Sequence, residues 1–561
     1  MPDTQDELPN QPNGESLPPQ SVAPSSQSVQ SPDNTTVNAS SSAPSASPSQ
    51  SSVPKTAKSH RRTFTLIILV LIIVATGAVW NLHHYRSSTS SYKKDIPLLR
   101  YGDAGGQVPD YPISAPNTDP SDLVSAQLFE GLVQYQDQNK IVPLLATGWS
   151  NPNDSTWIFN LRHNVKFNSG RTMTAQDVKY TLDYAVAHQN DSDGNTIFSL
   201  ASTIADVTVI NTYAVKITTN GPDPTMLNRL AFLGIIDSKA KLGDYDAGTG
   251  PYIVKPGTKP SGTSIDLVAN NNYWAGHVYT REVDITLASN ENKLAADAAK
   301  GQYDLAGNFT NSQLAQIHNV NHLDVPNLGV SFLGFNTEEA GSPMQSLVAR
   351  QAAAHALNIP KILKVAGLQG QQASQLVPPA IPGHDPSITD TPYNPTKAKQ
   401  LLAGVANLSK PLVLSFSPGS NLAAGEIAKE LDAVGFNVKA VQYSNLDNLV
   451  TAALGGQTDM YLLTYTSNTL DGLDILSSLL QNNQNYDNPQ IDSLSTQASN
   501  TLDPATRISI LQKIAVLAAD NEPVIPLYSA DDIYTVNKSY VVTADLPSED
   551  AGVLFWKVYQ N

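Results

Sequence analysis

Cysteine is absent from this sequence of 561 residues. Its absence excludes disulfide bonds, thiol-based catalysis, and zinc or iron–sulfur sites that depend on cysteine ligands. Basic residues are also scarce, because 34 lysines and arginines stand against 50 aspartates and glutamates and the net charge is −16. An acidic chain of this kind argues against a surface that binds nucleic acid, so we expect no nucleic-acid partner.

The sequence also lacks the common motifs of catalysis and metal binding. It contains no HExxH or GxSxG pattern, and its ten histidines are scattered. Ser238–Lys241 matches SxxK, but the SDN and KTG elements that accompany this acyl-transfer motif are missing. In Asp191–Asn195 the glycine lies too early for a calcium-binding EF-hand loop. His318 and His322 would share one face of a helix, yet no third ligand lies nearby. We therefore predict no catalytic residue, no cofactor, no metal site and no enzymatic activity.

Large apolar side chains are nearly missing from the first 59 residues, which are mainly Ser, Pro, Gln, Asn and Thr. Such a segment cannot bury enough apolar surface to offset the entropy lost on folding. We therefore expect residues 1–62 to form a disordered tail. It is either a flexible extension without a specific role or a segment that docks a partner or spans the cell wall.

A run of uncharged, mostly apolar residues follows from Phe64 to Trp80, near the lower limit of about 17 residues for a bilayer-spanning helix. The basic residues before it place the N-terminus in the cytoplasm. We predict a transmembrane helix over 63–82 and a linker over 83–95, with a binding domain outside a cell membrane that the chain crosses once. A cleaved signal peptide is the alternative, because Thr76–Ala78 offers small residues to a peptidase.

The remaining chain is too long for one hydrophobic core, so at least two lobes are expected. Strands and helices alternate regularly in its second half, which is typical of an open α/β sheet. The expected elements are Leu412–Phe416, Ala423–Val434, Asn437–Tyr443, Leu446–Leu454, Met460–Tyr465, the helix Pro504–Ala519 and the strands Val524–Tyr528 and Ile533–Val536.

The most informative stretch runs from Leu128 to Val186. Thr156–Arg162 alternates as a half-buried strand, and a helix is expected to begin at Thr174 with Asp177 as the second member of a capping box. The segments LFEGLV, PLLATGW, LRHNVKFNSG and TAQDVKYTL, at 128–133, 143–149, 161–170 and 174–182, closely resemble the signature of the family 5 solute-binding proteins. These are the extracytoplasmic receptors of peptide and nickel ABC importers.

The resemblance implies a fold as well as a family. Its members have an α/β, two-lobed periplasmic-binding-protein-like fold of class II, with a hinge between the lobes. Carried onto this chain, lobe I comprises residues 96–331 and 530–561, and lobe II comprises 332–529. The hinge residues implied at the two crossings are Phe335, Asn336, Leu527 and Tyr528. The absence of cysteine also removes the lipidated residue that tethers many members of the family.

The resemblance also implies a ligand site. In peptide-binding members a strand that ends in Gly-Trp, followed by an Asp, holds the peptide and its amino terminus. Here Tyr465 takes the Trp position, as an aromatic wall or as ordinary core packing. Asn468 stands in place of the Asp and supplies no countercharge, which argues against free peptides. Asp471 or Asp474 is a possible substitute. The predicted ligand-binding residues are Asn117, Thr118, Asp119, Thr464, Tyr465, Thr466, Ser467, Asn468 and Asp471.

The function implied is that of a membrane-anchored substrate-binding protein of an ABC importer. The protein would act as a monomer, close around an oligopeptide or a similar small polar solute, and deliver it to the ABC permease subunits. A non-transport ligand sensor or envelope scaffold that reuses the same fold is the alternative. A peptidase working in the cleft is a second alternative, although the sequence shows no nucleophile–base pair for it.

Overall fold

The computed structural model describes most of the chain from Lys93 onward. The chain divides into two compact units, residues 1–89 and 90–561, and the predicted tail and transmembrane helix lie outside the described residues. No helix in the described part is long and apolar enough to cross a membrane. The described residues are 93–104, 108, 119–136, 140–189, 202–241, 243–307, 309–467, 469–481, 486–542 and 553–560, with the side chains of 119–122 excepted.

One half of a 12-stranded sheet comes from residues between 99 and 306. Its strands lie in the order β11, β1, β10, β9 and β8, and β1 pairs in parallel with both β10 and β11. Alternate residues such as Ile265, Leu267 and Val283 are fully buried, as the two-residue period of a strand requires. The bounds are Leu305–Ala306 (β11), Leu99–Ala104 (β1), Glu282–Ala288 (β10), Ser264–Ala269 (β9) and Tyr252–Val254 (β8).

The signature stretch contributes β4 and β5 to a separate four-stranded sheet, whose order is β4, β5, β7, β6. In β5 the alternating Trp157, Phe159 and Leu161 are buried. Helix α3 begins after Thr174, and the predicted capping box with Asp177 is confirmed. The elements here are β2 (Val133–Gln136), β3 (Lys140–Pro143), β4 (Ala146–Asn153), β5 (Thr156–Leu161), β6 (Ile204–Asn211), β7 (Ala214–Thr219), α2 (Asp119–Leu128), α3 (Ala175–Ala187), α4 (Met226–Phe232), α5 (Glu291–Ala299) and α6 (Asn311–Leu314).

The other half of the large sheet has the order β16, β15, β17, β13. The predicted strands Leu412–Phe416 and Met460–Tyr465 are confirmed as β15 and β17, and the predicted strand–helix alternation holds between them. All six residues of β13 are buried, as expected for a central strand. The elements are β13 (Val330–Phe335), β15 (Leu412–Phe416), β16 (Val438–Gln442), β17 (Met460–Tyr465), α7 (Leu347–Ala356), α8 (Ile359–Ala366), α9 (Pro395–Leu402), α10 (Asn421–Val434), α11 (Leu446–Leu454), α12 (Gly472–Leu480), α13 (Pro489–Ser499) and α14 (Pro504–Asn521).

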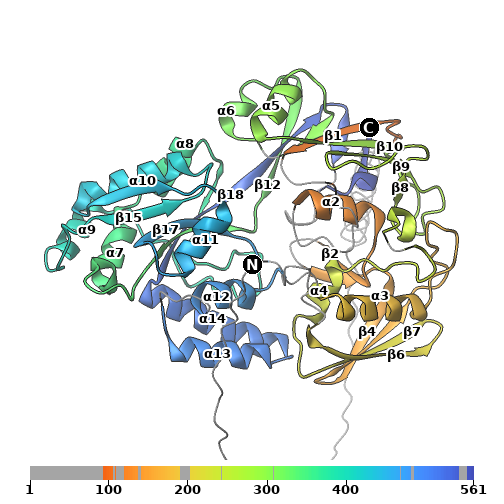
Figure 1. Cartoon of the computed structure of the whole chain (residues 1–561), viewed down its shortest axis with the longest axis horizontal. Helices are drawn as coiled ribbons and strands as arrows, with labels where there is room; N and C mark the ends of the chain where they lie inside the picture. The colour runs from red at the N-terminus through yellow and green to blue at the C-terminus, as the bar shows by residue number, and fades with distance from the viewer. Residues whose placement is uncertain are drawn as a thin grey trace, which may run out of the picture. The chain divides into compact units, whose positions relative to one another are not determined.

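A single long strand, β18 (Val524–Asn537), connects the two halves of the sheet (Figure 1). Its first residues pair with β13, and its last residues pair with β12 (Val320–Pro326). The expectation of two separate strands was wrong. Asp531 and Asp532 interrupt the apolar pattern, but β12 continues the hydrogen-bond ladder across them. The short strand β14 (Gly370–Gln372) also pairs with the middle of β18.

The buried apolar side chains fall into four clusters that belong to two groups. The fully buried members of two clusters come from residues 96–317 and 533–558, and those of the other two come from residues 328–528. We call these groups lobe I and lobe II. The change from one group to the other lies a few residues from the predicted bounds at 331/332 and 529/530.

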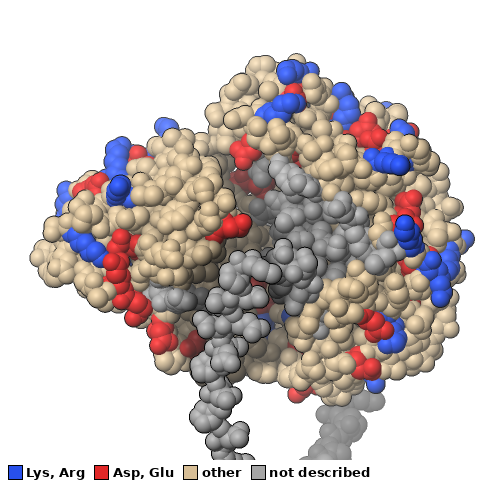
Figure 2. Space-filling model, in the orientation of Figure 1, with Lys and Arg blue, Asp and Glu red and all other residues tan. Residues whose placement is uncertain are grey.

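Charged side chains of both signs are scattered over the described surface. On the face shown in Figure 2, lysines and arginines alternate with aspartates and glutamates instead of gathering in one basic area.

Candidate functional site

The predicted ligand residues of lobe II lie at the end of β17 and in the turn that follows. Thr464 pairs with Ser331 of β13, and the two hydroxyl oxygens are 2.7 Å apart. Thr466 lies beside Gly329, where a Cβ would approach its hydroxyl oxygen to 2.6 Å. Asn117, Thr118 and Asn468 lie outside the described residues, and Asp119 is described only as the first backbone position of α2.

Tyr465 faces helix α12. Its hydroxyl lies 2.8 Å from the Ser478 hydroxyl and donates to the Asp474 carboxylate over 3.2 Å. Burial, followed by the negative charge of Asp474, raises the pKa of the tyrosine hydroxyl. The ring is half-buried against the apolar cluster of α12 and α14. This placement favours the core-packing interpretation of Tyr465 over that of an aromatic wall.

Asp471 already has a charged partner inside lobe II. Arg507 of α14 donates two hydrogen bonds to its carboxylate, at 2.6 and 2.7 Å, and both side chains are buried. Asp471 also caps α12 by accepting from the Leu473 amide. The hydroxyl of Ser467 accepts from the backbone amides of Thr469 and Asp471. Asp471 therefore has no free charge for a ligand, and the described contacts of both residues shape the turn itself.

The turn after β17 is also one of the places where lobe I contacts lobe II. The carbonyl of Thr469 accepts from the Tyr135 hydroxyl of β2 at 3.0 Å and from the Asn228 amide of α4 at 2.8 Å. The ring of Tyr135 packs 5.4 Å from that of Phe232, and both lie against the apolar cluster of lobe II. The next residue, Leu470, is fully buried at φ +49°, a conformation that non-glycine residues rarely adopt. We call this set of interactions the closure contact.

A cavity of about 330 Å³ lies where the chain passes between the lobes. Residues 326–330, 371–380 and 529–531 contribute to its lining, together with His384. Because the carbonyl of Val377 can only accept, His384 donates to it through Nδ1 over 2.8 Å and leaves Nε2 toward other groups. Asp531 is the carboxylate in the described lining, and burial, followed by Asp324, raises its pKa. We call this space the junction cavity. Gly329, which lies between the lining residues Leu328 and Val330, is adjacent to Thr464 and Thr466.

The predicted hinge residues lie mostly inside lobe II. Phe335 is fully buried opposite Met460, and Asn336 is tied to Gly456 and Asp459 by hydrogen bonds. Leu527 is also fully buried, whereas Tyr528 pairs with Ser331 and Gln372 close to the changeover. The two connections between the lobes are residues 327–329 and the middle of β18. They lie closer to lobe I than Phe335 and Asn336, because β13 belongs along its whole length to the core of lobe II.

A buried carboxylate organises the signature residues of lobe I. Glu130 accepts from Thr249 at 2.7 Å, from Tyr273 at 2.7 Å and from Trp274 at 2.6 Å. Burial raises the pKa of Glu130 to about 7, although the three donors and the charge of Arg162 act against this rise. One side chain therefore joins the signature segment 128–133 to Thr249 and to the pair Tyr273 and Trp274. It was not identified as important from the sequence, where it is one glutamate among many.

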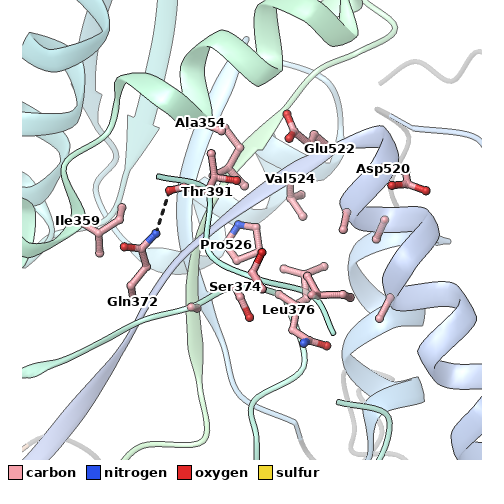
Figure 3. Close-up of a pocket in the computed structure, with 18 of the residues that line it drawn as sticks. Ala354, Ile359, Gln372, Ser374, Leu376, Thr391, Asp520, Glu522, Val524 and Pro526 are labelled. Carbon is pink, nitrogen blue, oxygen red and sulfur yellow. Dashed lines mark hydrogen bonds between the residues drawn. The ribbon is translucent and has the colours of Figure 1, made fainter. Parts of the chain in front are cut away.

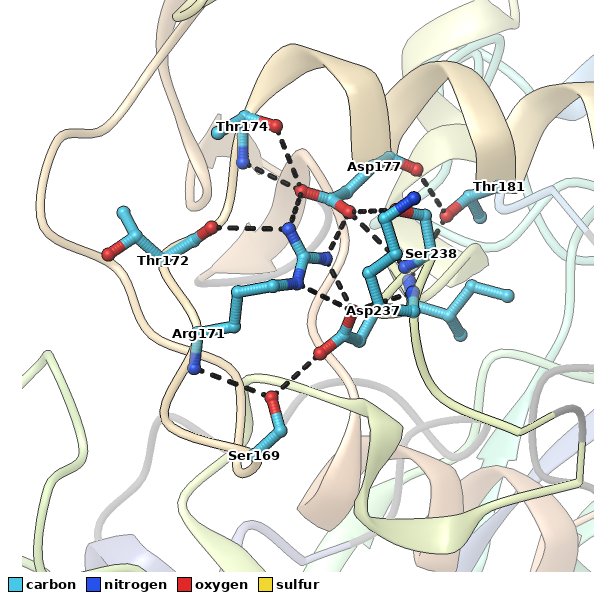
Figure 4. A network of polar contacts seen from close by, with 10 residues as sticks. Ser169, Arg171, Thr172, Thr174, Asp177, Thr181, Asp237 and Ser238 are labelled. Atoms are coloured by element: carbon cyan, nitrogen blue, oxygen red, sulfur yellow. Dashed lines mark hydrogen bonds and ion pairs between the residues drawn. The ribbon is translucent and has the colours of Figure 1, made fainter.

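A second polar network holds the start of α3 (Figure 4). The guanidinium of Arg171 pairs with both Asp177 and Asp237, and Ser238 donates to Asp177 over 2.7 Å. Burial alone would raise the pKa of Asp177, but hydrogen bonds from Arg171 and Ser238 outweigh it and leave the pKa below its ordinary value. The two aspartates have partners within the protein, so this part of the signature serves the fold of lobe I.

The histidine pair does not form a metal site. Helix α6 ends at Leu314, so His318 lies outside any helix and His322 lies on strand β12. The two cannot share a helix face, because neither lies in a helix. Among the described residues, no group of three or more histidines and acidic residues is placed to hold a metal ion.

The signature motifs and the two-lobed sheet agree with the comparison with protein families. The family described as bacterial extracellular solute-binding proteins, family 5, matches residues 140–487, more than half of the chain. The chain belongs to this family. Its members bind solutes, and the relatives found are binding proteins, not enzymes.

Individual relatives of this family 5 protein have low sequence identity to it but align over most of its length. Heme-binding protein A of Haemophilus influenzae is 26% identical over 72% of this chain and 82% of the relative. Di/tripeptide-binding protein 1 of Pseudomonas aeruginosa is 24% identical over 72% of this chain and 84% of the relative. The structure of HbpA2 from Haemophilus parasuis covers 83% of this chain and 100% of its own, with a TM-score of 0.71 and 22% identity. That likeness supports the fold.

Several residues of the candidate site were not predicted from the sequence. Tyr135 and Asn228 of the closure contact lie far from β17 along the chain, and Asp531 was assigned to a gap between two strands. One usable signal was the proline-rich segment Val377–His384, whose irregular backbone is typical of a loop that lines a site.

Proposed function

We propose that this protein is the solute-binding component of an ABC importer and that it closes its two lobes around an oligopeptide or a similar polar solute. The observation that carries the proposal is the closure contact, in which lobe I holds the turn after β17 through the Thr469 carbonyl. The junction cavity lies close to this turn, so a ligand held there would be enclosed by both lobes.

The connections between the lobes suit a hinge motion. Residues 327–329 and the middle of β18 are the two connections, and each lies beside the junction cavity. A ligand that contacts both lobes favours the closed arrangement, because some of its interactions form only there. The hydrogen bonds to Thr469 would then form with closure and break with release.

The chemistry of the junction cavity favours a ligand that carries hydrogen-bond donors. Asp471 is neutralised by Arg507, whereas Asp531 lies in the cavity wall. Its carboxylate and the Nε2 atom of His384 are acceptors for an ammonium or amide group. We infer that Asp531 takes the role of a countercharge for the amino end of a peptide or for another cationic group.

A thermal-shift screen of the full-length protein tests this function. Di- to octapeptides are compared with nickel chelates, sugars and heme, because a ligand that binds only the folded state raises the melting temperature. For a peptide that binds, we expect Asp531→Asn to weaken binding by about tenfold or more and Asp154→Asn, at an exposed turn, to leave it unchanged. Stabilisation by a non-peptide alone would replace the peptide with another solute.

The closure contact has its own test. Tyr135→Phe removes one hydrogen bond to Thr469 and keeps the ring, so ligand affinity should fall by a few-fold to about tenfold. Tyr213→Phe serves as the matched control in lobe I. Equal affinities in the two variants would show that the contact plays no part in ligand binding.

We also propose that residues 63–82 anchor the protein in the cell membrane, with the tail in the cytoplasm and the binding domain outside. The uncharged run after a basic segment supports this topology. Resistance of the full-length protein to alkaline extraction, and digestion of only the outer domain by external protease, are the expected results. Co-purification of permease and ATPase subunits would support import; their absence, with no ligand in the screen, would support the sensor or scaffold.

A further inference from the structure

Lobe II contains a second cavity, of about 180 Å³, which shares the lining residues 372–375 with the junction cavity. It lies between the end of α7, helix α14 and the start of β18 (Figure 3). This space far exceeds the roughly 10–15 Å³ that one water molecule needs. We call it the lobe II cavity; its apolar walls include Ala354, Leu357, Leu476, Ala518 and Val524.

One wall of the lobe II cavity carries the carboxylate of Glu522. Glu522 follows α14 in the left-handed conformation, at φ +45°, and lines the cavity near Ala354 and Val524. Its Oε2 atom is buried and has no hydrogen-bond partner among the described residues. A buried acceptor without a donor is unfavourable, and such groups in folded proteins are usually satisfied by water or a ligand.

The nearest cation does not satisfy this oxygen. The Arg350 guanidinium donates to the backbone carbonyls of Glu522, Asn521, Met344 and Gln345. It therefore closes the end of α14 instead of pairing with the carboxylate. Burial raises the pKa of Glu522 to about 7, and the positive charges of Arg350 and Lys397 limit this rise.

We propose that the lobe II cavity binds a small primary ammonium compound with a short apolar chain. The ammonium group donates to the Glu522 carboxylate and supplies the positive charge that the carboxylate lacks. The alkyl chain lies against the apolar walls formed by α7, α12 and β18. This site is distinct from the one between the lobes and does not depend on the proposed import function.

The test is calorimetric titration of the purified full-length protein with n-butylammonium, n-butanol and butyrate at pH 7. We expect n-butylammonium to bind one site, n-butanol to bind at least about tenfold more weakly, and butyrate not to bind, because only the cation complements Glu522. Glu522→Gln keeps the shape of the side chain and should weaken n-butylammonium binding by about tenfold or more. Asp520→Asn removes an exposed carboxylate from the same lining and should change binding less than about twofold.

Proton release provides an independent readout. A carboxylate with a pKa of about 7 is half protonated at pH 7, and a bound cation lowers that pKa. Binding should therefore release up to about half a proton at pH 7, measured from heats in buffers of different ionisation enthalpy. This measurement decides the proposal if Glu522→Gln does not fold. Arg350, Lys397 and Asp520 are the other charged groups around this carboxylate, and only Glu522 should account for the proton.

Four results would overturn the proposal. These are no binding at millimolar concentrations, equal binding of n-butanol and n-butylammonium, unchanged binding by Glu522→Gln, and binding without proton release. Loss of binding in Asp531→Asn but not in Glu522→Gln would place the ammonium between the lobes and would likewise exclude the lobe II cavity.

Discussion

Glu130 in lobe I and Glu522 in lobe II both have carboxyl pKa values raised to about 7 by burial, yet their surroundings differ. Glu130 accepts hydrogen bonds from Thr249, Tyr273 and Trp274. Glu522 has a buried oxygen that receives no hydrogen bond from a described residue. The comparison shows that a raised pKa reports burial and does not reveal a role. The number of hydrogen-bond donors around a buried carboxylate distinguishes one that stabilises the fold from one that is available to a ligand.

The partners of Glu130 explain why it belongs to the framework. They come from two other segments of lobe I, so removing the carboxylate would leave three donors unpaired at once. Asp471 resembles Glu130 because its loss would also leave a donor unpaired, but this donor, Arg507, carries a full charge. These three carboxylates form a series from charge-paired, through hydrogen-bonded, to unpartnered.

The largest effect is expected at the charge pair. Arg507→Leu leaves Asp471 buried without its countercharge and should lower the free energy of unfolding by about 3–5 kcal/mol. Urea unfolding followed by circular dichroism measures the loss. The double variant Arg507→Leu with Asp471→Leu should recover part of it, because no buried charge remains. A single variant as stable as wild type would show that the pair contributes nothing.

The next effect separates the two glutamates directly. Glu130→Gln places an amide group against fixed donors such as the Trp274 indole and should cost about 1–3 kcal/mol. Glu522→Gln removes a buried charge without removing a protein partner, so stability at pH 8 should stay the same or rise. Parallel urea unfolding of both variants checks this. Equal losses in the two variants would break the comparison.

Stability should also depend on pH through these groups. Because the folded pKa of Glu522 lies above its ordinary value of 4.5, its contribution is present below that value and is lost as pH rises through about 7. Wild-type protein should therefore lose stability between pH 5 and 8, and Glu522→Gln should lose less, by on the order of 1 kcal/mol. Melting temperatures across this range provide the measurement, and parallel curves for the two proteins would contradict it.

The pKa values of Asp177, Asp237 and Asp304 are lowered, so these groups make stability depend on pH in the opposite direction. Their contributions are present above the ordinary value of 3.8 and are lost as pH falls through the lower folded values. They therefore affect the acid limb of the same profile and leave the range from pH 5 to 8 to the glutamates.

The smallest effect is expected for an exposed pair. Lys179 and Asp183 lie four residues apart on α3, with side chains 32% and 52% exposed. Lys179→Met should change the free energy of unfolding by less than about 0.5 kcal/mol, because water screens the interaction. A loss of stability as large as that of Glu130→Gln would contradict this expectation. It would mean that the number of polar partners sets the contribution to stability, whether or not the pair is buried.

Local patterns in the sequence predicted much of the framework. The capping box of α3 and the strands β15 and β17 are short-range features, determined by residues within a few positions of each other. Asp471 was different, because its partner Arg507 lies 36 residues away and no local pattern indicates the pairing. The junction cavity is assembled from three distant segments. The helix face that His318 and His322 would have shared does not form, because α6 ends before them and His322 lies on strand β12.

Residues Gln372–Gln375 line both the junction cavity and the lobe II cavity. This segment is tied in place by Gln372, which donates to the Thr391 carbonyl over 3.3 Å, and by Gln375, which exchanges hydrogen bonds with Asp385. This segment therefore separates the two cavities, each of which has room for a bound molecule. If filling one space changes the affinity of the other by some factor, thermodynamics requires the same factor in reverse. A molecule bound in the lobe II cavity would then change the affinity of the junction cavity for its solute. The bound solute would change the affinity for that molecule by the same factor.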